Sequence, residues 1–428
     1  MRALGRLALA AVCALGAFGA VAQTKAPAHK ADAAFVIAVI PDTQNYIDFD
    51  SQRAEGFPID AREAFLDQMS FVRRNLVSQG GEIAFVTAVG DVWQHPSRNM
   101  DAAHTALGLK ADISDAAQAR FSDRPGGVNS EMAVARAGYA MIASESPFSV
   151  SPGNHDYDAF WVDPRSPPPG QPSGQLHYGG LDNFRSVFGA QSPLFKARPW
   201  YAASFNGGAD SAQIFEAGGY RFLHIGLEMA PADDVLAWAS GVVARHKGLP
   251  TIVTIHDHLN PAGERLPIPV VDFKAVHPGH NNPEDLWTKF LSKQDQIFMV
   301  FSGHQNGQSR RVDTNAFGHK VWQMLSDYQN RDQALKAFDP DHKLKAHGFG
   351  DGWMRLARFD LAAAVPAVRV RAYSTYYHAY ANELPTYAAW YRPAEKPQVS
   401  DEAFLAEEDF TLVLDDFRAR FGAPRSGR

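Results

Sequence analysis

Short, nearly continuous apolar runs alternate with amphipathic segments along the first third of the chain. Residues 34–40 and 83–89 read as strands buried on both faces of a sheet, and residues 148–150 form a third, shorter run. Residues 59–77 carry apolar side chains at helical spacing, and a further helix is predicted over residues 131–144. The order strand, helix, strand, helix, strand predicts a layered α/β domain with parallel strands.

The same alternation continues towards the C-terminus, where strands predominate. Further helices are predicted at residues 101–120, 181–188, 231–246 and 284–292, and further strands at residues 200–205, 213–215, 220–227, 250–255, 296–301, 321–325, 353–359, 368–373 and 410–414. Residues 161–176 are rich in Pro, Gly and Ser and predict a long loop, either a functional cover of a site or a surface insertion. We expect residues 34–420 to form one domain with a β-rich C-terminal part.

The first residues have the pattern of a secretory signal. Arg2 and Arg6 precede an uncharged apolar run, residues 7–18, which is followed by a small-residue Ala-Val-Ala cleavage site. The run is shorter than the roughly 20 residues that span a bilayer. We therefore expect residues 1–22 to be a signal peptide and residues 23–33 a polar tail, and the mature protein to lie in the periplasm or outside the cell without a membrane anchor.

Composition narrows the possible chemistry. The 428 residues are 45% hydrophobic and 21% charged, which is ordinary for a globular protein. The formal net charge of −6 gives no strong nucleic-acid signal, because proteins of that class usually present a strongly basic face. The single cysteine, Cys13, lies in the expected signal peptide, so the mature chain has no disulfide, thiolate nucleophile or Cys-bound zinc.

Polar side chains directly follow five of the predicted buried strands. In residues 148–157 the strand stops at Pro-Gly and is followed by Asn154, His155 and Asp156. The other four strand ends carry Asp42 with Gln44, Asp91, His256, and His304 with Asn306. The C-terminal ends of parallel strands lie along one edge of a sheet, where ligands bind. These side chains are therefore expected to converge.

A shared metal site accounts for all five strand ends, whereas treating each polar residue as an ordinary buried side chain does not. One histidine after a strand is more often a buried side chain bonded to backbone, but five strand ends all offer oxygen or nitrogen donors. Such donors suit Mn, Fe, Mg or Zn better than copper or an iron–sulfur cluster. We prefer His256 to His258 as a ligand because it follows its strand directly, and we expect His95, His277 and His280 to be solvated.

The five polar blocks resemble those of the calcineurin-like metallophosphoesterases. That family's blocks read D-x-H, G-D-x-x-D/N, G-N-H-D/E, H and G-H-x-H. Here, in the same order, they read Asp-Thr-Gln at residues 42–44, Gly-Asp-Val-Trp-Gln at 90–94, Gly-Asn-His-Asp at 153–156, His256, and Gly-His-Gln-Asn at 303–306. The Pro-Asp-Thr-Gln of residues 41–44 is similar to the first block of a secreted subgroup, and residues 350–355 and 373–380 also look similar to that subgroup.

The resemblance implies a fold and a set of ligands. The fold would be an αββα four-layer sandwich of two mixed sheets flanked by helices, with two divalent metal ions (Mn, Fe, Mg or Zn) at the C-terminal strand ends. Asp91 would bridge the two ions. The first ion would be bound by Asp42, Gln44 and Asn306, and the second by Asn154, His256 and His304. His155 would be the general acid near the leaving group or a phosphate ligand, with Asp156 orienting it.

The expected function is a metal-dependent phosphoesterase that hydrolyses phosphomonoesters or phosphodiesters, small molecules or nucleotides, by a metal-activated hydroxide. Gln44 and Asn306 stand where the family has histidine. Neutral amide oxygens bind first-row metals less tightly than imidazole, so the first metal site should be weaker and favour Mn, Mg or Fe over Zn. Two alternatives remain: a metal-poor family member that acts as a binding or scaffold protein, and a one-metal hydrolase.

Overall fold

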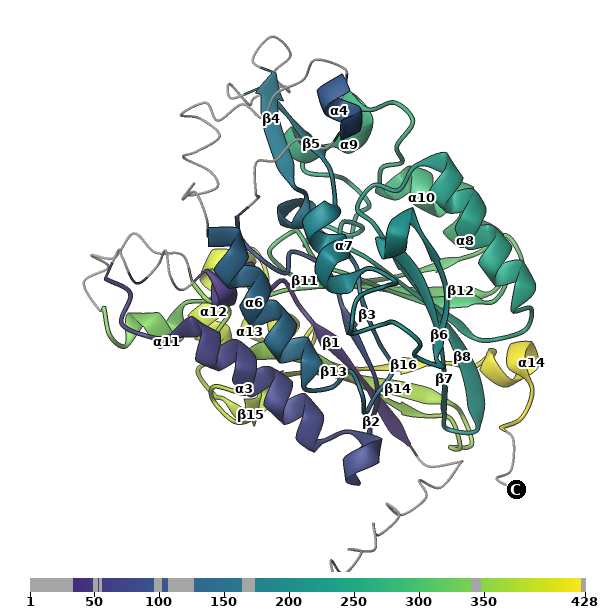
Figure 1. The fold of residues 1–428 in the computed structure, drawn as a ribbon. Coiled ribbons are helices and arrows are strands. Elements are labelled where there is room, and N and C mark those ends of the chain that lie inside the picture. Colours follow the sequence, from purple (N-terminus) through teal and green to yellow (C-terminus); the bar gives the residue numbers. More distant parts are fainter. Residues whose placement is uncertain are drawn as a thin grey trace, which may run out of the picture.

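A computed structural model of the chain describes residues 34–48, 53, 56–95, 102–106, 127–163, 174–339 and 348–424. It is a mixed α/β structure with two seven-stranded sheets and a two-stranded hairpin (Figure 1). The expected signal peptide (1–22) and polar tail (23–33) lie outside the described residues, as does most of the helix expected at 101–120, of which α4 (Ala102–Ala106) is described. No helix in the described part of the chain is both long and apolar enough to cross a membrane.

The first sheet contains the parallel strands predicted near the N-terminus. Strands β1 (Phe35–Ile40), β2 (Ile83–Ala88) and β3 (Phe148–Val150) lie side by side and run parallel. Helices α3 (Ala61–Arg74) and α6 (Gly127–Ala140) connect them, which confirms the predicted order. Every residue of β1 is buried, as its unbroken apolar run predicts for a strand covered on both faces.

On the other side of β1 this sheet is antiparallel and comes from the C-terminal part of the chain. It adds β13 (Trp353–Asp360), β14 (Ala367–Ser374), β15 (Ala379–Tyr380) and β16 (Asp409–Val413). Strand β13 pairs with β1 and β14, and both β15 and β16 pair with β14. The sheet therefore joins segments that are more than half the chain apart.

The second sheet has the strand order β11-β12-β10-β9-β8-β7-β6. Its strands are β6 (Tyr201–Phe205), β7 (Asp210–Ala217), β8 (Tyr220–Leu227), β9 (Thr251–Ile255), β10 (Ile297–Ser302), β11 (Gly307–Thr314) and β12 (Lys320–Asp327). The central strands β8, β9, β10 and β12 run parallel, and the outer strands are antiparallel to their neighbours. Both sheets are thus mixed.

Of the four apolar clusters in the described residues, three link the sheets to each other and to the helices beside them. One is shared by the two sheets, where Phe35 of β1 contacts Phe222 of β8 with ring centroids 5.5 Å apart. The second joins the first sheet to α3 and α6, and the third joins the second sheet to α8 (Asp233–Arg245) and α10 (Pro283–Lys289). In Figure 1, α3 and α6 lie on one side of the sheets and α8 and α10 on the other. The remaining α-helices of the described residues are α1 (Gln44–Ile47), α7 (Asp182–Phe188), α9 (Phe273–Val276), α11 (Gln333–Lys336), α12 (Tyr387–Glu395), α13 (Asp401–Leu405) and α14 (Phe417–Phe421).

The structure corrects the prediction of one loop over residues 161–176. Strands β4 (Ala159–Asp163) and β5 (Gln175–Gly179) pair as an antiparallel hairpin and include both ends of that segment. Phe160 and Tyr178 anchor the hairpin, because both are buried in the cluster that joins the first sheet to α3 and α6. Residues 164–173 lie outside the described residues, so the role of the Pro-rich part stays open.

Candidate metal centre

The predicted site residues converge, but they come from two sheets and not from one edge of a single sheet. Asp91 follows β2 of the first sheet, whereas His256 follows β9 and His304 follows β10 of the second. The Asp42 carboxylate, just after β1, accepts a hydrogen bond from the backbone N–H of His304 at 3.0 Å. The sheets share an apolar core, and the ends of their central parallel strands therefore meet across the space between them.

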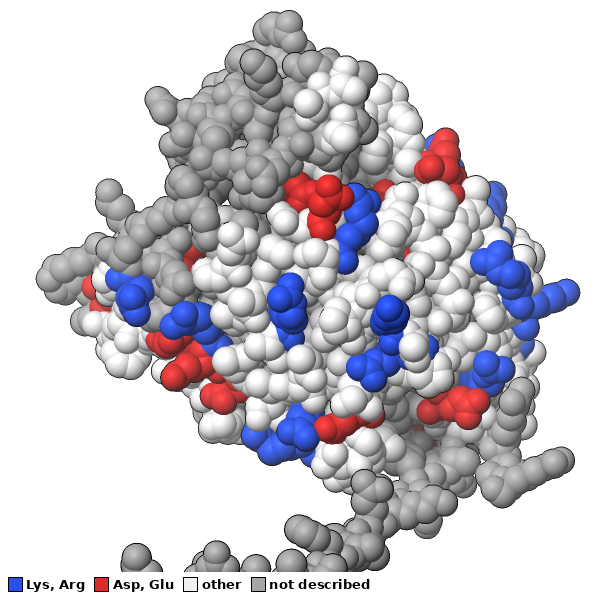
Figure 2. Space-filling view, viewed as in Figure 1, with Lys and Arg blue, Asp and Glu red and all other residues white. Residues whose placement is uncertain are grey.

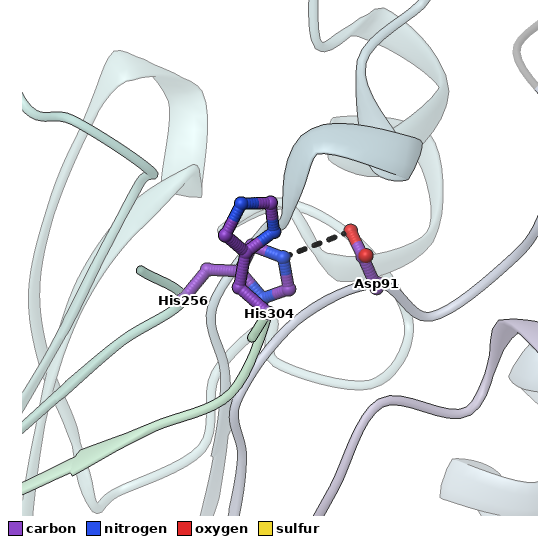
Figure 3. Close-up of side chains that lie close together, drawn as sticks. All are labelled: Asp91, His256 and His304. Carbon is purple, nitrogen blue, oxygen red and sulfur yellow. Dashed lines mark ion pairs between the residues drawn. The ribbon is translucent and has the colours of Figure 1, made fainter. Parts of the chain in front are cut away.

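Asp91, His256 and His304 form the centre of the group (Figure 3). All three are buried, and their donor atoms lie within 4.8 Å of one another. His256 Nδ1 contacts the carbonyl oxygen of Val89 at 2.9 Å, so Nδ1 carries the hydrogen. His256 Nε2 then faces two oxygens at 3.1 Å, Oδ1 of Asn154 and Oδ1 of Asp91. If Nε2 carried only its lone pair, it would repel both oxygens. A positive charge at Nε2, either a proton or a metal ion, removes this repulsion.

The pKa values of the buried groups also indicate that a positive charge stabilises this centre. Burial alone would lower the pKa of His256, but the carboxylates of Asp91 and Asp42 raise it to about 10. Burial and the positive charge of His256 lower the pKa of His304 to about 3, which keeps that imidazole neutral, the form that binds metals. Burial and the nearby carboxylate of Asp327 raise the pKa of Asp42 well above its usual value. Crowded, buried carboxylates are the environment that a bound cation relieves.

Three buried polar atoms beside this centre lack a hydrogen-bond partner within the described part of the chain. They are Oδ1 of Asp42, Oε1 of Gln44 and Nε2 of His304. A buried polar atom without a partner costs about 1–3 kcal/mol, and most such atoms in folded proteins are paired. All three are metal-ligand atom types, so divalent cations bound at this centre would give each of them a partner. The residues present therefore fit a metal ion.

The backbone of the site is held in uncommon conformations. Asp91 and His304 adopt left-handed φ angles of 49° and 74°, which cost on the order of 1–3 kcal/mol each outside glycine. The neighbouring glycines allow close approach: a Cβ on Gly303 would lie 2.1 Å from Oδ1 of Asp42, and one on Gly153 would lie 2.2 Å from Oδ1 of Asp91. These contacts explain why glycine precedes the polar residue in both blocks.

Gln44 and Asn306, the two amides where the family has histidine, lie in different surroundings. Gln44, in α1, donates from Nε2 to Oδ2 of Asp91 at 3.1 Å, and this leaves its amide oxygen without a donor. Asn306 is exposed and lies at the rim of a pocket that Asp327, Arg331 and Trp390 also line. Its assignment as a ligand of the first ion stays a prediction.

His155 has a different orienting partner from the one expected. Its Nδ1 donates to the carbonyl oxygen of Gln94 at 2.8 Å, and its backbone N–H donates to Oδ1 of Asp91 at 2.9 Å. The carboxylate of Asp156 instead accepts the backbone N–H groups of Gly153 at 2.8 Å and Val92 at 2.9 Å. Asp156 therefore ties two loops together through their backbone N–H groups. Burial raises the pKa of Asp156 to about 8.

Two residues near the centre were missed by the sequence reasoning. Asp327 ends β12 and is buried, and burial raises its pKa to about 7. The sequence could have revealed Asp327, because it closely follows the strand predicted at 321–325, as the other candidate ligands follow theirs. Glu131 of α6 was missed because an acidic residue in an amphipathic helix normally faces solvent.

The other histidines also differ in part from expectation. His95 was predicted to be solvated, but it is buried, with Nδ1 2.5 Å from Oε1 of Glu131 and 3.5 Å from Oδ1 of Asp48. His280 is half-buried and contacts the Ala230 carbonyl oxygen through Nδ1. His258 is directed at Gln323, 2.8 Å from its Oε1, and its neighbour His256 enters the centre. The expected position of these histidines in loops did not show which of their rings would be buried by the tertiary fold.

Comparison with known proteins gives limited information. No family model matches the chain. The chain is similar to the uncharacterized protein YvnB of Bacillus subtilis (strain 168), with 24% identity over 231 residues. The match covers 52% of this chain but only 16% of YvnB, so the chain spans a small part of that protein's length. Since YvnB is itself uncharacterized, the function has to be argued from the site.

Proposed function

We propose that this protein is an exported, metal-dependent phosphoesterase of the calcineurin-like kind, with an αββα four-layer arrangement and two divalent ions (Mn, Fe, Mg or Zn) at the strand ends. The observation that carries the proposal is the set of three buried, unpaired donor atoms on Asp42, Gln44 and His304 beside the Asp91–His256 pair. The two mixed sheets with helices packed on each support the fold assignment.

The ligands divide into two groups around Asp91. Asp42 and Gln44, with Asn306, would hold one ion, and Asn154, His256 and His304 would hold the other. Bound divalent ions supply charge neutralisation at a phosphoryl group and a lower pKa of bound water. Figure 2 shows basic and acidic side chains interspersed over the described part of one face, without the continuous basic surface that is typical of binding to long nucleic acids.

The chain's own proton chemistry would come from His155. Its Nδ1 hydrogen is held by the Gln94 carbonyl oxygen, and its Nε2 lies 4.0 Å from Oδ2 of Asp91. Nε2 is therefore the ring atom that faces the centre. When the ring is doubly protonated, Nε2 would donate its proton to the leaving oxygen while Nδ1 keeps its hydrogen. A leaving alkoxide needs this proton far more than a nitrophenolate does.

A one-metal hydrolase is the second candidate, and the structure offers a specific reason for it. The donor atoms of Asp91, His256 and His304 lie within 4.8 Å of one another, whereas Asn306 is exposed. Such an arrangement would retain one ion firmly and the other weakly. Metal content after dialysis separates the two candidates, because two retained ions per chain exclude the one-metal form.

The direct test is a substrate panel. The purified full-length product would be stripped with a chelator, reloaded with Mn, Fe, Mg or Zn, and assayed on aryl phosphomonoesters, phosphodiesters and nucleotides. Asp91→Asn provides the matched control, because it keeps the size of the side chain and removes its charge. We expect metal-dependent hydrolysis that this variant lowers by at least about a thousandfold, the scale of a lost electrostatic contribution. Rates that stay at background on the whole panel, for the wild type and for Asp91→Asn and with every metal, would contradict the proposal and favour a binding protein.

A further inference from the structure

Four successive backbone N–H groups after Asp91 are held by two buried carboxylates. Asp156 accepts those of Val92 at 2.9 Å and Trp93 at 3.4 Å. Oε2 of Glu131 accepts the next two, from Gln94 at 2.9 Å and His95 at 3.0 Å. Glu131 is itself only 2% exposed, and its second oxygen contacts Nδ1 of His95 at 2.5 Å. Helix α6 thus fixes the position of the peptide groups around Gln94.

The same Gln94 residue faces His155 through its other backbone group. Its carbonyl oxygen accepts the hydrogen of His155 Nδ1 at 2.8 Å. This hydrogen bond sets the tautomer, because Nδ1 is the donor and Nε2 is left to exchange protons. It also sets the direction of the ring, so a shift of the Gln94 peptide would turn Nε2 away from the centre.

We propose that Glu131 is a positioning residue for His155, acting through the peptide of Gln94. The inference rests on the proposed phosphoesterase function for its catalytic consequence, and on the contacts above for its geometry. The hydrogen bonds of Glu131 within the described residues go to Gln94 and His95, which are not among the expected metal ligands. Its carboxylate accepts hydrogen bonds from Gln94 and His95, and the Gln94 carbonyl transmits their position to the ring.

Glu131 is part of a larger buried polar group behind this loop. His95 and Asp48 complete the group, since His95 Nδ1 lies 3.5 Å from Oδ1 of Asp48.

The catalytic test uses leaving groups of different acidity. Wild type, Glu131→Ala and Glu131→Gln would be assayed on methyl aryl phosphodiesters from nitrophenyl to phenyl. We expect Glu131→Ala to lower kcat for the phenyl ester at least about tenfold more than for the nitrophenyl ester, because a mispositioned acid matters only for a poor leaving group. Glu131→Gln should recover most of the loss, since its amide oxygen still accepts the two N–H groups. In the background of His155→Ala, Glu131→Ala should have little further effect.

Asp351→Ala is the matched structural control. Asp351 is likewise a fully buried carboxylate that accepts two successive backbone N–H groups, from Gln333 at 2.8 Å and Ala334 at 3.1 Å. Its loss should lower thermal stability without changing the dependence on leaving group. If Glu131→Ala slows all esters equally, or adds fully to His155→Ala, the positioning role is overturned.

A second measurement does not depend on activity. Histidine labelled with ¹⁵N in the ring reports tautomers by NMR in the metal-free protein, and a His155→Gln sample identifies the signals of His155. We expect the Nδ1–H form in wild type and a mixture in Glu131→Ala. Unchanged His155 signals in Glu131→Ala would overturn the inference. An inactive wild type with the expected NMR change would instead refute the phosphoesterase and keep the positioning contact.

Discussion

The two sides of the metal centre differ in what the protein provides before any ion binds. On the β9 side, formed by Asp91, Asn154, His256 and His304, Nε2 of His256 already contacts Oδ1 of Asn154 and Oδ1 of Asp91 at 3.1 Å, and Nε2 of His304 is the atom without a partner among the described residues. On the β1 side, formed by Asp42, Gln44 and Asn306, two buried oxygens have no partner among the described residues and Asn306 is exposed. A proton on His256 can hold the β9 side together, whereas the β1 side depends on a cation. The β9 side should therefore be the more strongly preorganised.

The largest expected effect comes from breaking the β9 side. His256→Ala leaves the buried carboxylate of Asp91 without its cation partner, and breaking a buried pair in this way costs about 3–5 kcal/mol. We expect kcat/KM to fall by about a thousandfold or more, and the metal-free protein to unfold at lower denaturant. Gln44→Ala on the β1 side should cost about tenfold in activity and little stability. Equal losses for the two variants, measured by steady-state kinetics and urea unfolding, would remove the distinction between the sides.

A pH series sharpens the same comparison. Folding raises the pKa of His256 from 6.5 to about 10, so its stabilising contribution is present below pH 6.5 and is lost as pH rises towards 10. Folding also raises the pKa of Asp156 from 3.8 to about 8, which destabilises the native state increasingly as pH rises through this range. In both cases the native state binds more protons than the unfolded chain, so stability falls with rising pH.

The metal-free protein should thus lose about 3–5 kcal/mol of unfolding free energy between pH 6.5 and pH 9. Bound Mn should flatten this slope, because a neutral His256 then has a metal partner in place of a proton. Urea unfolding at matched pH values, with chelator or with Mn, measures the difference. A metal-free protein that is more stable at pH 9 than at pH 6.5 would show that protonated His256 does not hold the β9 side.

The contrast also explains how far sequence reasoning reached. Strands such as β1 and β9 are continuous apolar runs because both faces are covered, and their polar followers lie where each run stops. These local features predict the strands and most candidate ligands. They do not show which strands lie next to each other in a sheet. For this reason they could not predict that β1 pairs antiparallel with β13, or that the ligands divide between two sheets.

Residues whose environment is created by tertiary packing were the ones missed. Strand β11 reads Gly-Gln-Ser-Arg-Arg-Val-Asp-Thr and lacks an apolar run, yet pairing with β12 holds it at the edge of the sheet. Glu131 and His95 look solvent-exposed in sequence and become buried because each satisfies the other and the adjacent backbone. Buried polar residues that pair with one another leave no hydrophobic pattern in the sequence, so they cannot be predicted from it.

The smallest expected effect comes from repairing the β1 side. Gln44→His places an imidazole where the amide oxygen now has no donor, and imidazole binds Zn and other first-row metals more tightly than a neutral amide does. We expect about tenfold tighter binding of the weaker ion by isothermal titration, a shift of preference from Mn towards Zn, and an unchanged stronger ion. Asn306→His is the matched variant, and because Asn306 is exposed it should gain less. An equal gain from both substitutions would place Asn306 in the first metal site as firmly as Gln44, and a tightening of the stronger ion instead would mean that Gln44 belongs to the β9 side.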